Sequence, residues 1–241
     1  MKIRSLFRPL VLAGIAACST AQAAPLLLSD YAVTGPTTTV RFANLTPRLN
    51  GQMNAGGFRS SVAGSSDPAL QNFVSWCIDI FQPAKLGTTV NDYTQLTLAQ
   101  YGSLSAERGA MLGNLASIAY DQALTSSVSS AAFQLAVWEI VNETSHNLDL
   151  SKNTFKAWGA TDGSIALAQQ WLNSLPQQQS RFGFDIFASA TAQDVIRFYE
   201  LPKPPLAAAT AESVPEPGAL ALIALAGVAA FATRRRRALP V

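Results

Sequence analysis

Two apolar segments flanked by basic residues, one at each end of the chain, confine the foldable part of this protein to its middle. Residues 1–24 begin with three basic side chains, continue with an apolar stretch over residues 10–17 and end in Ala-Gln-Ala-Ala. A basic start, an apolar centre too short to span a bilayer and a small-residue site are typical of a secretory signal peptide. We therefore expect a signal peptidase to remove residues 1–24, and residues 25–201 to fold after export through the inner membrane.

Cys18 gives the same segment an alternative interpretation, because Ile15-Ala16-Ala17-Cys18 resembles a lipobox. Such a site would make Cys18 a lipidated N-terminus. The small residues at 21–24 fit ordinary cleavage better, and isoleucine is a weaker first residue for a lipobox. With ordinary cleavage Cys77 is the one cysteine of the mature chain, which excludes a disulfide-rich scaffold and a zinc site built from cysteines.

The C-terminal end carries a second segment with the features of a targeting signal. A Pro-Glu-Pro element, an apolar run over residues 219–233 and a basic cluster follow one another there. The first element is Pro215, Glu216 and Pro217, and the basic cluster is Arg234, Arg235, Arg236 and Arg237. The apolar run is shorter than the roughly 20 residues that usually span a bilayer, and the arginines would stay on the cytoplasmic side.

These features, in this order, resemble the PEP-CTERM sorting signal of Gram-negative bacteria over residues 214–237. The resemblance implies an exosortase-type processing enzyme as a partner. It also implies transient anchoring by the short C-terminal helix, followed by delivery to the cell surface or extracellular matrix. An ordinary single-pass anchor is the alternative. Residues 202–213 are rich in proline and alanine and lack an apolar period, so we expect an extended linker there.

Charge and composition narrow the function of the middle segment. The chain is 49% hydrophobic and 13% charged, which excludes a disordered polypeptide. Its net charge of +2 is misleading, since seven of the 17 basic residues lie in the two terminal segments. Residues 25–213 hold 10 basic and 14 acidic side chains, so a basic nucleic-acid surface is excluded. The single histidine and the scattered acids predict no metal site, and no cofactor motif is present.

The order of the predicted elements indicates an α+β domain over residues 25–201. We expect an antiparallel, barrel-like sheet with a helical subdomain, because strands come first, helices next and strands last, without regular alternation. Residues 50–67 are rich in Gly, Ser and Asn and predict an irregular loop. The strands are predicted at residues 37–42, 73–81, 182–188 and 194–201, and the helices at residues 105–123, 129–142 and 164–175.

The segment FVSWCIDIF at residues 73–81 is the clearest strand. Its alternation places Trp76 on an apolar face, and Cys77 and Asp79 on the opposite, less apolar face. In the helix SSAAFQLAVWEIVN, Phe133 belongs to the predicted core face, while Gln134 and Trp138 lie one turn apart on its flank. This position suits a carboxamide that is shielded but reachable. Glu139 and Glu143 predict a solvated face.

A thiol and a carboxamide are the two groups that an internal thioester requires. The sulfur of Cys77 would attack the side-chain carbonyl of Gln134, and ammonia would leave. The product is an electrophile that a passing amine or hydroxyl can open, which attaches the nucleophile to Gln134 and frees Cys77. Aromatic neighbours such as Trp76 and Trp138 would slow hydrolysis by excluding water.

The local motifs Trp76-Cys77-Ile78-Asp79 and Phe133-Gln134-Leu135-Ala136-Val137-Trp138-Glu139 resemble the two signatures of bacterial thioester domains. This family is best known from Gram-positive surface adhesins that bind targets covalently. The resemblance implies that Cys77 and Gln134 form the bond and that Trp138 is the aromatic residue of the motif. The expected partner is an unidentified protein amine or polysaccharide hydroxyl, and the expected role is adhesion or matrix attachment. Because each molecule would react once, we do not expect an enzyme.

Less reactive interpretations remain open for each of these residues. Cys77 can be an inert core residue of a non-covalent matrix protein. Trp76 and Trp138 can be core anchors, and Asp79 either orients an incoming amine or bonds to backbone. His146 is either a solvated loop residue or a general base. A Cys77–His146 hydrolase is disfavoured because a cysteine within a strand lacks the helix N-terminus that lowers a thiol pKa.

Overall fold

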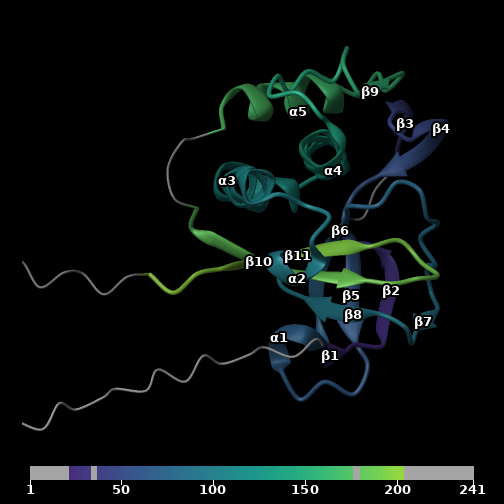
Figure 1. The fold of residues 1–241 in the computed structure, drawn as a ribbon, viewed down its shortest axis with the longest axis vertical. Helices are drawn as coiled ribbons and strands as arrows, with labels where there is room; N and C mark the ends of the chain where they lie inside the picture. The colour runs from purple at the N-terminus through teal and green to yellow at the C-terminus, as the bar shows by residue number, and fades with distance from the viewer. Residues whose placement is uncertain (1–21, 34–36, 176–179, 204–241) are drawn as a thin grey trace, which may run out of the picture. The chain divides into compact units, whose positions relative to one another are not determined.

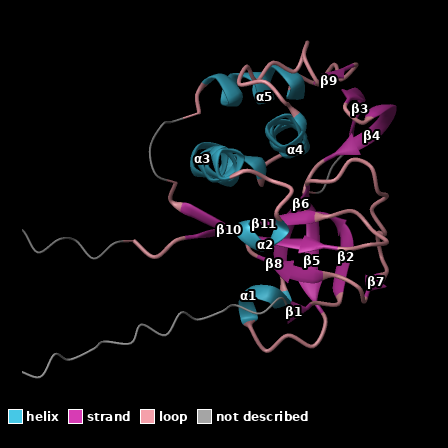
Figure 2. Cartoon of the chain, in the orientation of Figure 1, coloured by secondary structure: helices cyan, strands magenta, loops and turns pink. Residues whose placement is uncertain are grey.

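An antiparallel sheet lies beneath a group of helices in the part of the protein that the structure describes (Figures 1 and 2). The computed structural model describes residues 22–33, 37–175 and 180–203. The larger sheet has eight strands, whose pairings are all antiparallel. In spatial order they are β1 (Gln22–Ala23), β8 (Thr94–Leu96), β10 (Phe182–Ala188), β11 (Val195–Glu200), β6 (Phe73–Cys77), β5 (Phe58–Val62), β2 (Leu26–Tyr31) and β7 (Thr89–Val90).

This sheet curls into a half-barrel, which confirms the predicted α+β fold with a barrel-like antiparallel sheet and a helical region (Figure 2). Its two edge strands, β1 and β7, contain two residues each, and such short edges offer little template for further pairing. The strand predicted at residues 182–188 is confirmed as β10.

A second, three-stranded sheet consists of β4 (Arg48–Ala55), β3 (Thr38–Leu45) and β9 (Phe155–Trp158), in that spatial order. The irregular loop predicted at residues 50–67 is wrong, since most of β4 and all of β5 lie there. β4 pairs with β3 along its whole length, and Gly51 leaves room for the ring of Phe42. Its polar, glycine-containing sequence forms a strand because of this pairing, which composition does not reveal.

Five helices complete the described part of the chain, and a capping side chain marks the start of four of them. The three long ones are α3 (Ala106–Ala123), α4 (Ser127–Asn142) and α5 (Ser164–Asn173), and the short ones are α1 (Pro68–Gln71) and α2 (Leu98–Tyr101). The hydroxyl of Ser105 accepts a hydrogen bond from the Arg108 N–H at the start of α3, and Ser126 does the same for α4 with Ser129. In residues 22–33, 37–175 and 180–203, no helix is long and apolar enough to cross a membrane. The predicted C-terminal helix and residues 1–21 of the predicted signal peptide lie outside the described residues.

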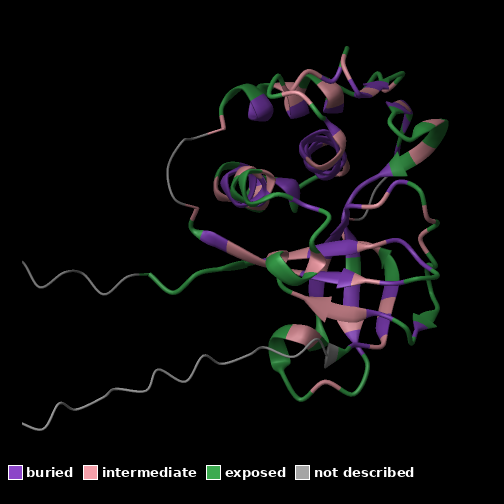
Figure 3. Ribbon diagram, viewed as in Figure 1, coloured by how far each residue is buried: buried purple, intermediate pink, exposed green. Residues whose placement is uncertain are grey.

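Helix α4 is buried on every side (Figure 3), packed between α3, α5 and strands of both sheets. The solvated face predicted for Glu139 and Glu143 is therefore wrong, since these residues are 0% and 3% exposed. Oε1 of Glu139 accepts a hydrogen bond from the Asp149 N–H at 2.7 Å. Glu143 accepts from the N–H groups of Ser145 at 2.7 Å and Thr154 at 2.8 Å. The two carboxylates thus hold the segment after α4 against the helix.

The environments of Glu139 and Glu143 shift the pKa values of these two acids in opposite directions. Burial, assisted by the charges of Glu143 and Asp149, raises the pKa of Glu139 from 4.5 to about 8. Burial also acts to raise the pKa of Glu143, but hydrogen bonds from the backbone of Ser145, Thr154 and Phe155 outweigh it and lower that pKa. A raised carboxyl pKa favours the folded state at low pH, and this contribution is lost as pH rises toward the folded value.

We expect Glu139→Gln to become increasingly stabilising, relative to the wild type, between pH 5 and pH 9. The glutamine still accepts from the Asp149 N–H but cannot ionise. Thermal unfolding should show the difference in Tm between variant and wild type growing by about 3 °C or more over this range. Glu143→Gln is the control, and it should lower Tm most at neutral pH, where the charged carboxylate is favoured. A constant Tm difference for Glu139→Gln would contradict the prediction.

Candidate functional site

Cys77 is the last residue of β6, so the strand predicted to reach Phe81 ends earlier. The cause is a local turn, in which Oδ1 of Asp79 accepts a hydrogen bond from the Phe81 N–H at 2.7 Å. On the β11 side the pairing continues one residue further, because the Ile78 N–H donates to the Asp194 carbonyl at 2.9 Å.

The other side of Cys77 faces a gap next to the start of β5, because the pairing between β5 and β6 stops at Phe58 and Ser75. The side chain of Gln134 fills this gap. Its Oε1 accepts a hydrogen bond from the Cys77 N–H at 2.9 Å, and its Nε2 donates to the Cys77 carbonyl at 2.8 Å. The carboxamide therefore takes the place that a strand residue would occupy, and it satisfies two buried backbone groups.

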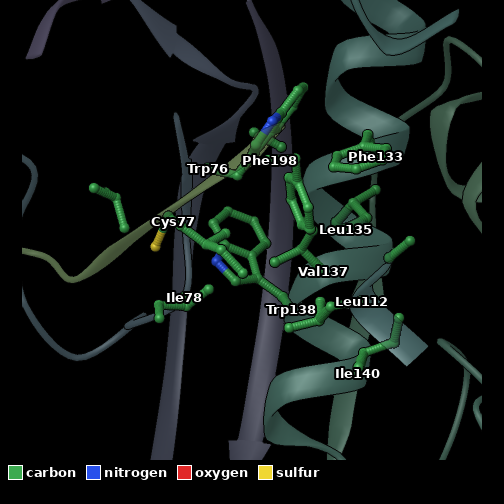
Figure 4. Packing of buried hydrophobic residues seen from close by; sticks show 14 of the residues in the cluster. Trp76, Cys77, Ile78, Leu112, Phe133, Leu135, Val137, Trp138, Ile140 and Phe198 are labelled. Atoms are coloured by element: carbon green, nitrogen blue, oxygen red, sulfur yellow. The ribbon is translucent and has the colours of Figure 1, made fainter. Parts of the chain in front are cut away.

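One face of α4 supplies this completion with residues spaced one turn apart. Ser130 Oγ accepts from the Gly57 N–H at 3.1 Å, just before β5, and Gln134 pairs with Cys77 one turn later. Trp138 follows after another turn and lies toward the sulfur of Cys77 (Figure 4). The helix thus meets the ends of β5 and β6 through three side chains at helical spacing.

The site is closed in this state. Cys77 and Gln134 are each 1% exposed, so the predicted reachable position of Gln134 is wrong. The reason is that α4 carries no solvated flank. The Cys77 thiol donates to the Asp79 carbonyl at 3.2 Å. Burial raises the pKa of this thiol, the nearby indole of Trp138 acts against the rise, and the charges of Asp79 and Asp194 add to it.

The two predicted tryptophans lie on different sides of β6. Trp76 is fully buried and packs against Phe133, with ring centroids 4.5 Å apart. Trp138 is 2% exposed and packs near Phe155, with centroids 6.5 Å apart. Figure 4 shows the side chains of Trp76 and Cys77 directed away from each other. Trp138 therefore helps to exclude water on the side of β6 that bears the sulfur, whereas Trp76 belongs to the core on the other side.

Asp79 and His146 occupy other positions. Asp79 is half-buried, and its carboxylate is engaged by the Phe81 N–H. His146 lies on an exposed loop, and its Nδ1 is 3.1 Å from Glu107 Oε1 on α3. Within residues 22–33, 37–175 and 180–203, no group of three or more His, Cys, Asp or Glu side chains is arranged to hold a metal ion.

Sequence reasoning missed Asp194. Its carboxylate accepts hydrogen bonds from the Tyr101 hydroxyl at 3.0 Å and the Ser189 N–H at 2.8 Å. Burial raises the pKa of Asp194, and its charge in turn acts on the Cys77 thiol. No sequence signal could have identified this residue, since only the register between β11 and β6 brings it beside Cys77.

The arrangement suits acyl chemistry at the carbonyl of Gln134. The sulfur and the carboxamide belong to residues held together by two mutual hydrogen bonds. The Cys77 N–H already donates to the oxygen on which negative charge would develop if a nucleophile attacked this carbonyl. A backbone donor fixed at that oxygen is the arrangement that stabilises tetrahedral intermediates.

We expect removal of the carboxamide to destabilise the fold even where no thioester can form. In a Cys77→Ala background, Gln134→Met leaves two buried backbone groups without partners and should cost about 2–5 kcal/mol of unfolding free energy. Urea unfolding measures this loss. Gln170→Met, the same exchange at an exposed position of α5, is the matched control and should change little. Equal losses for the two exchanges would show that the pairing contributes nothing.

Comparison with known proteins gives three findings. The PEP-CTERM protein-sorting motif matches residues 213–237, which confirms the sorting motif predicted near the C-terminus. The motif implies export, surface association and processing by exosortase-type machinery. No curated protein sequence matches the chain.

Two solved structures are similar to the chain. The N-terminal thioester domain of a surface protein from Clostridium perfringens is 13% identical, with a TM-score of 0.42, over 67% of this chain and 100% of that one. A cysteine-to-alanine mutant of such a Clostridium perfringens domain is 10% identical, with a TM-score of 0.43, over 67% of this chain and 99% of that one. These structural neighbours are bacterial thioester domains, the family that the sequence motifs resemble, and at such identities the likeness concerns the fold alone.

Proposed function

We propose that this protein is an exported surface protein in which Cys77 and Gln134 form an internal thioester, which then binds an amine or hydroxyl of a surface partner covalently. The observation that carries the proposal is the mutual pairing of the Cys77 backbone with the Gln134 carboxamide, at 2.9 and 2.8 Å. It holds the residue that bears the thiol against the group that the thiol would attack, although 57 positions separate the two in the sequence.

The reaction has two balanced steps. In the first, the Cys77 sulfur attacks Cδ of Gln134, the S–C bond forms, the C–N bond breaks, and ammonia leaves with the thiol proton. In the second, an amine or hydroxyl attacks the same carbon, the C–S bond breaks, and the sulfur regains a proton as a thiol. The partner remains attached to residue 134 through an amide or ester, so each molecule reacts once and the protein is not an enzyme.

Burial of the pair has a direct consequence for the partner. A closed, water-poor site protects a thioester from hydrolysis, but with Cys77 and Gln134 each 1% exposed, a macromolecule cannot reach the acyl carbon in this state. Covalent binding of a protein amine or a polysaccharide hydroxyl therefore requires the structure over the pair to open. Small amines should react before large ones.

The sorting motif supports the location of this activity. A signal peptidase would remove residues 1–24, the C-terminal segment would hold the protein in the inner membrane, and an exosortase-type enzyme would then process the motif at residues 213–237. The folded part would be delivered to the cell surface or extracellular matrix, where covalent attachment gives an adhesive role.

One observation favours an alternative function. The Gln134 carboxamide completes the backbone pairing of Cys77 by itself, so the contact would also serve a non-covalent matrix protein in which Cys77 is an inert core residue. In that protein the thiol stays free and the amide stays intact.

Intact mass separates the two functions. If the thioester forms, freshly purified protein should be about 17 Da lighter than its sequence, and methylamine should add about 31 Da. Cys77→Ala and Gln134→Ala should each abolish both changes. Comparing every variant with its own expected mass removes the effect of processing at the termini. An unmodified mass, together with a thiol that titrates freely after unfolding, would favour the non-covalent protein.

A further inference from the structure

The indole N–H of Trp138 is buried near the Cys77 sulfur and, within the part of the chain that the structure describes, has no hydrogen-bond partner that explains its position. Trp138 is 2% exposed, and its Nε1 meets no hydrogen-bond acceptor of good geometry among the described residues. Unpaired buried donors are uncommon in folded proteins, because desolvating an N–H without giving it an acceptor is costly. In Figure 4 the indole nitrogen lies on the side of its ring that faces the Cys77 sulfur.

The position of Trp138 on α4 explains why it faces the sulfur. Gln134 is anchored to both backbone groups of Cys77, and Trp138 lies one helical turn further along the same side of the helix. The anchor fixes the rotation of α4 relative to β6, and Phe155 packs against the indole from the second sheet. The direction of the indole N–H is therefore set by the fold rather than by a hydrogen bond of its own.

Resting on the proposed function, we infer that the indole N–H of Trp138 is the hydrogen-bond donor that stabilises negative charge on the Cys77 sulfur when the C–S bond forms and breaks. When an amine opens the thioester, the electron pair of the C–S bond passes to the sulfur before a proton arrives. At that moment the sulfur needs a donor, and the unpaired indole N–H supplies one without any reorganisation. In thioester formation the same donor favours the attacking thiolate.

The surroundings of the sulfur make such a donor necessary. Burial and the charges of Asp79 and Asp194 all disfavour a thiolate, whereas the nearby indole of Trp138 favours it. The Cys77 N–H is committed to the Gln134 oxygen, so it serves the carbonyl and not the sulfur. The Cys77 N–H therefore stabilises negative charge on the acyl oxygen, and the Trp138 N–H stabilises it on the leaving sulfur.

Trp76 provides a contrast within the same strand. Its indole Nε1 is also buried and, within the described part of the chain, has no acceptor. Its side chain points away from Cys77 and packs against Phe133 and Tyr120. Loss of its N–H should therefore affect packing as much as the same loss at Trp138, but it should leave the sulfur unaffected.

The kinetic test compares Trp138→Phe with Trp76→Phe, which each replace an indole by a smaller apolar ring. Both variants are first checked for folding by thermal unfolding, and the rate of methylamine opening is then followed by intact mass. Trp138→Phe should slow the reaction by about 10-fold or more, in line with the loss of one donor to developing charge. Trp76→Phe should stay within about 3-fold of the wild type. Equal rates for the two variants would overturn the inference.

A spectroscopic test does not depend on a thioester or on the stability of a tryptophan variant. Cys77→Ala and Cys77→Ser both lack the thiol but keep the Gln134 carboxamide that anchors α4, and going from the alanine to the serine variant adds a hydroxyl acceptor at this position. The indole N–H resonance of Trp138 in a ¹H–¹⁵N spectrum should move downfield, and that of Trp76 should not. Movement of neither resonance would overturn the inference. An absent thioester mass in the wild type with a moving Trp138 resonance would refute the proposed function and leave the donor contact intact.

Discussion

The pairing of one side-chain amide with one backbone residue organises this protein. Strand β5 ends before Cys77, and without a substitute the N–H and carbonyl of Cys77 would be buried and unpaired. Gln134 provides that substitute from the middle of α4. The contact fixes the rotation and height of the helix against the sheet, so the placement of Ser130, Phe133 and Trp138 follows from it.

The same contact links the stability of the fold to the proposed reactivity. The Gln134 carboxamide completes the sheet, and its oxygen already accepts a hydrogen bond from the N–H of the residue that bears the thiol. Burial bears on the proposed thioester in two ways, since it would protect the acyl bond from water and it makes a charged sulfur unfavourable. In the proposed reaction, Trp138 would offset the second effect, and the first effect means that the site would have to open before a large partner could react.

Polar side chains inside α4 also determine how the rest of the domain is attached. Glu139 and Glu143 bind the backbone of the segment that leads from α4 to β9, and β9 completes the second sheet. The pKa of Glu139 is raised and that of Glu143 is lowered, so the first acid favours the folded state at low pH and the second favours it at neutral pH. Residues 129–140 of α4 are all buried, and Glu139 and Glu143 are accommodated as buried residues because each accepts at least one backbone N–H donor.

By itself the sequence determined the sorting motif, the α+β class, the long helices and strand β10, and it predicted that Cys77 and Gln134 meet, since these depend on local order, periodicity and motif. Only the tertiary structure decided the strands within residues 50–67, the burial of Glu139 and Glu143, and the approach of Asp194 to Cys77. Strand pairing and helix burial are set by partners that are distant in the chain. An apolar pattern therefore identifies one buried face of a helix or strand, but it does not show which elements cover the remaining faces. For the same reason the sequence placed Trp138 near Cys77 and Gln134, but only the packing of α4 against β6 directed its indole nitrogen toward the sulfur.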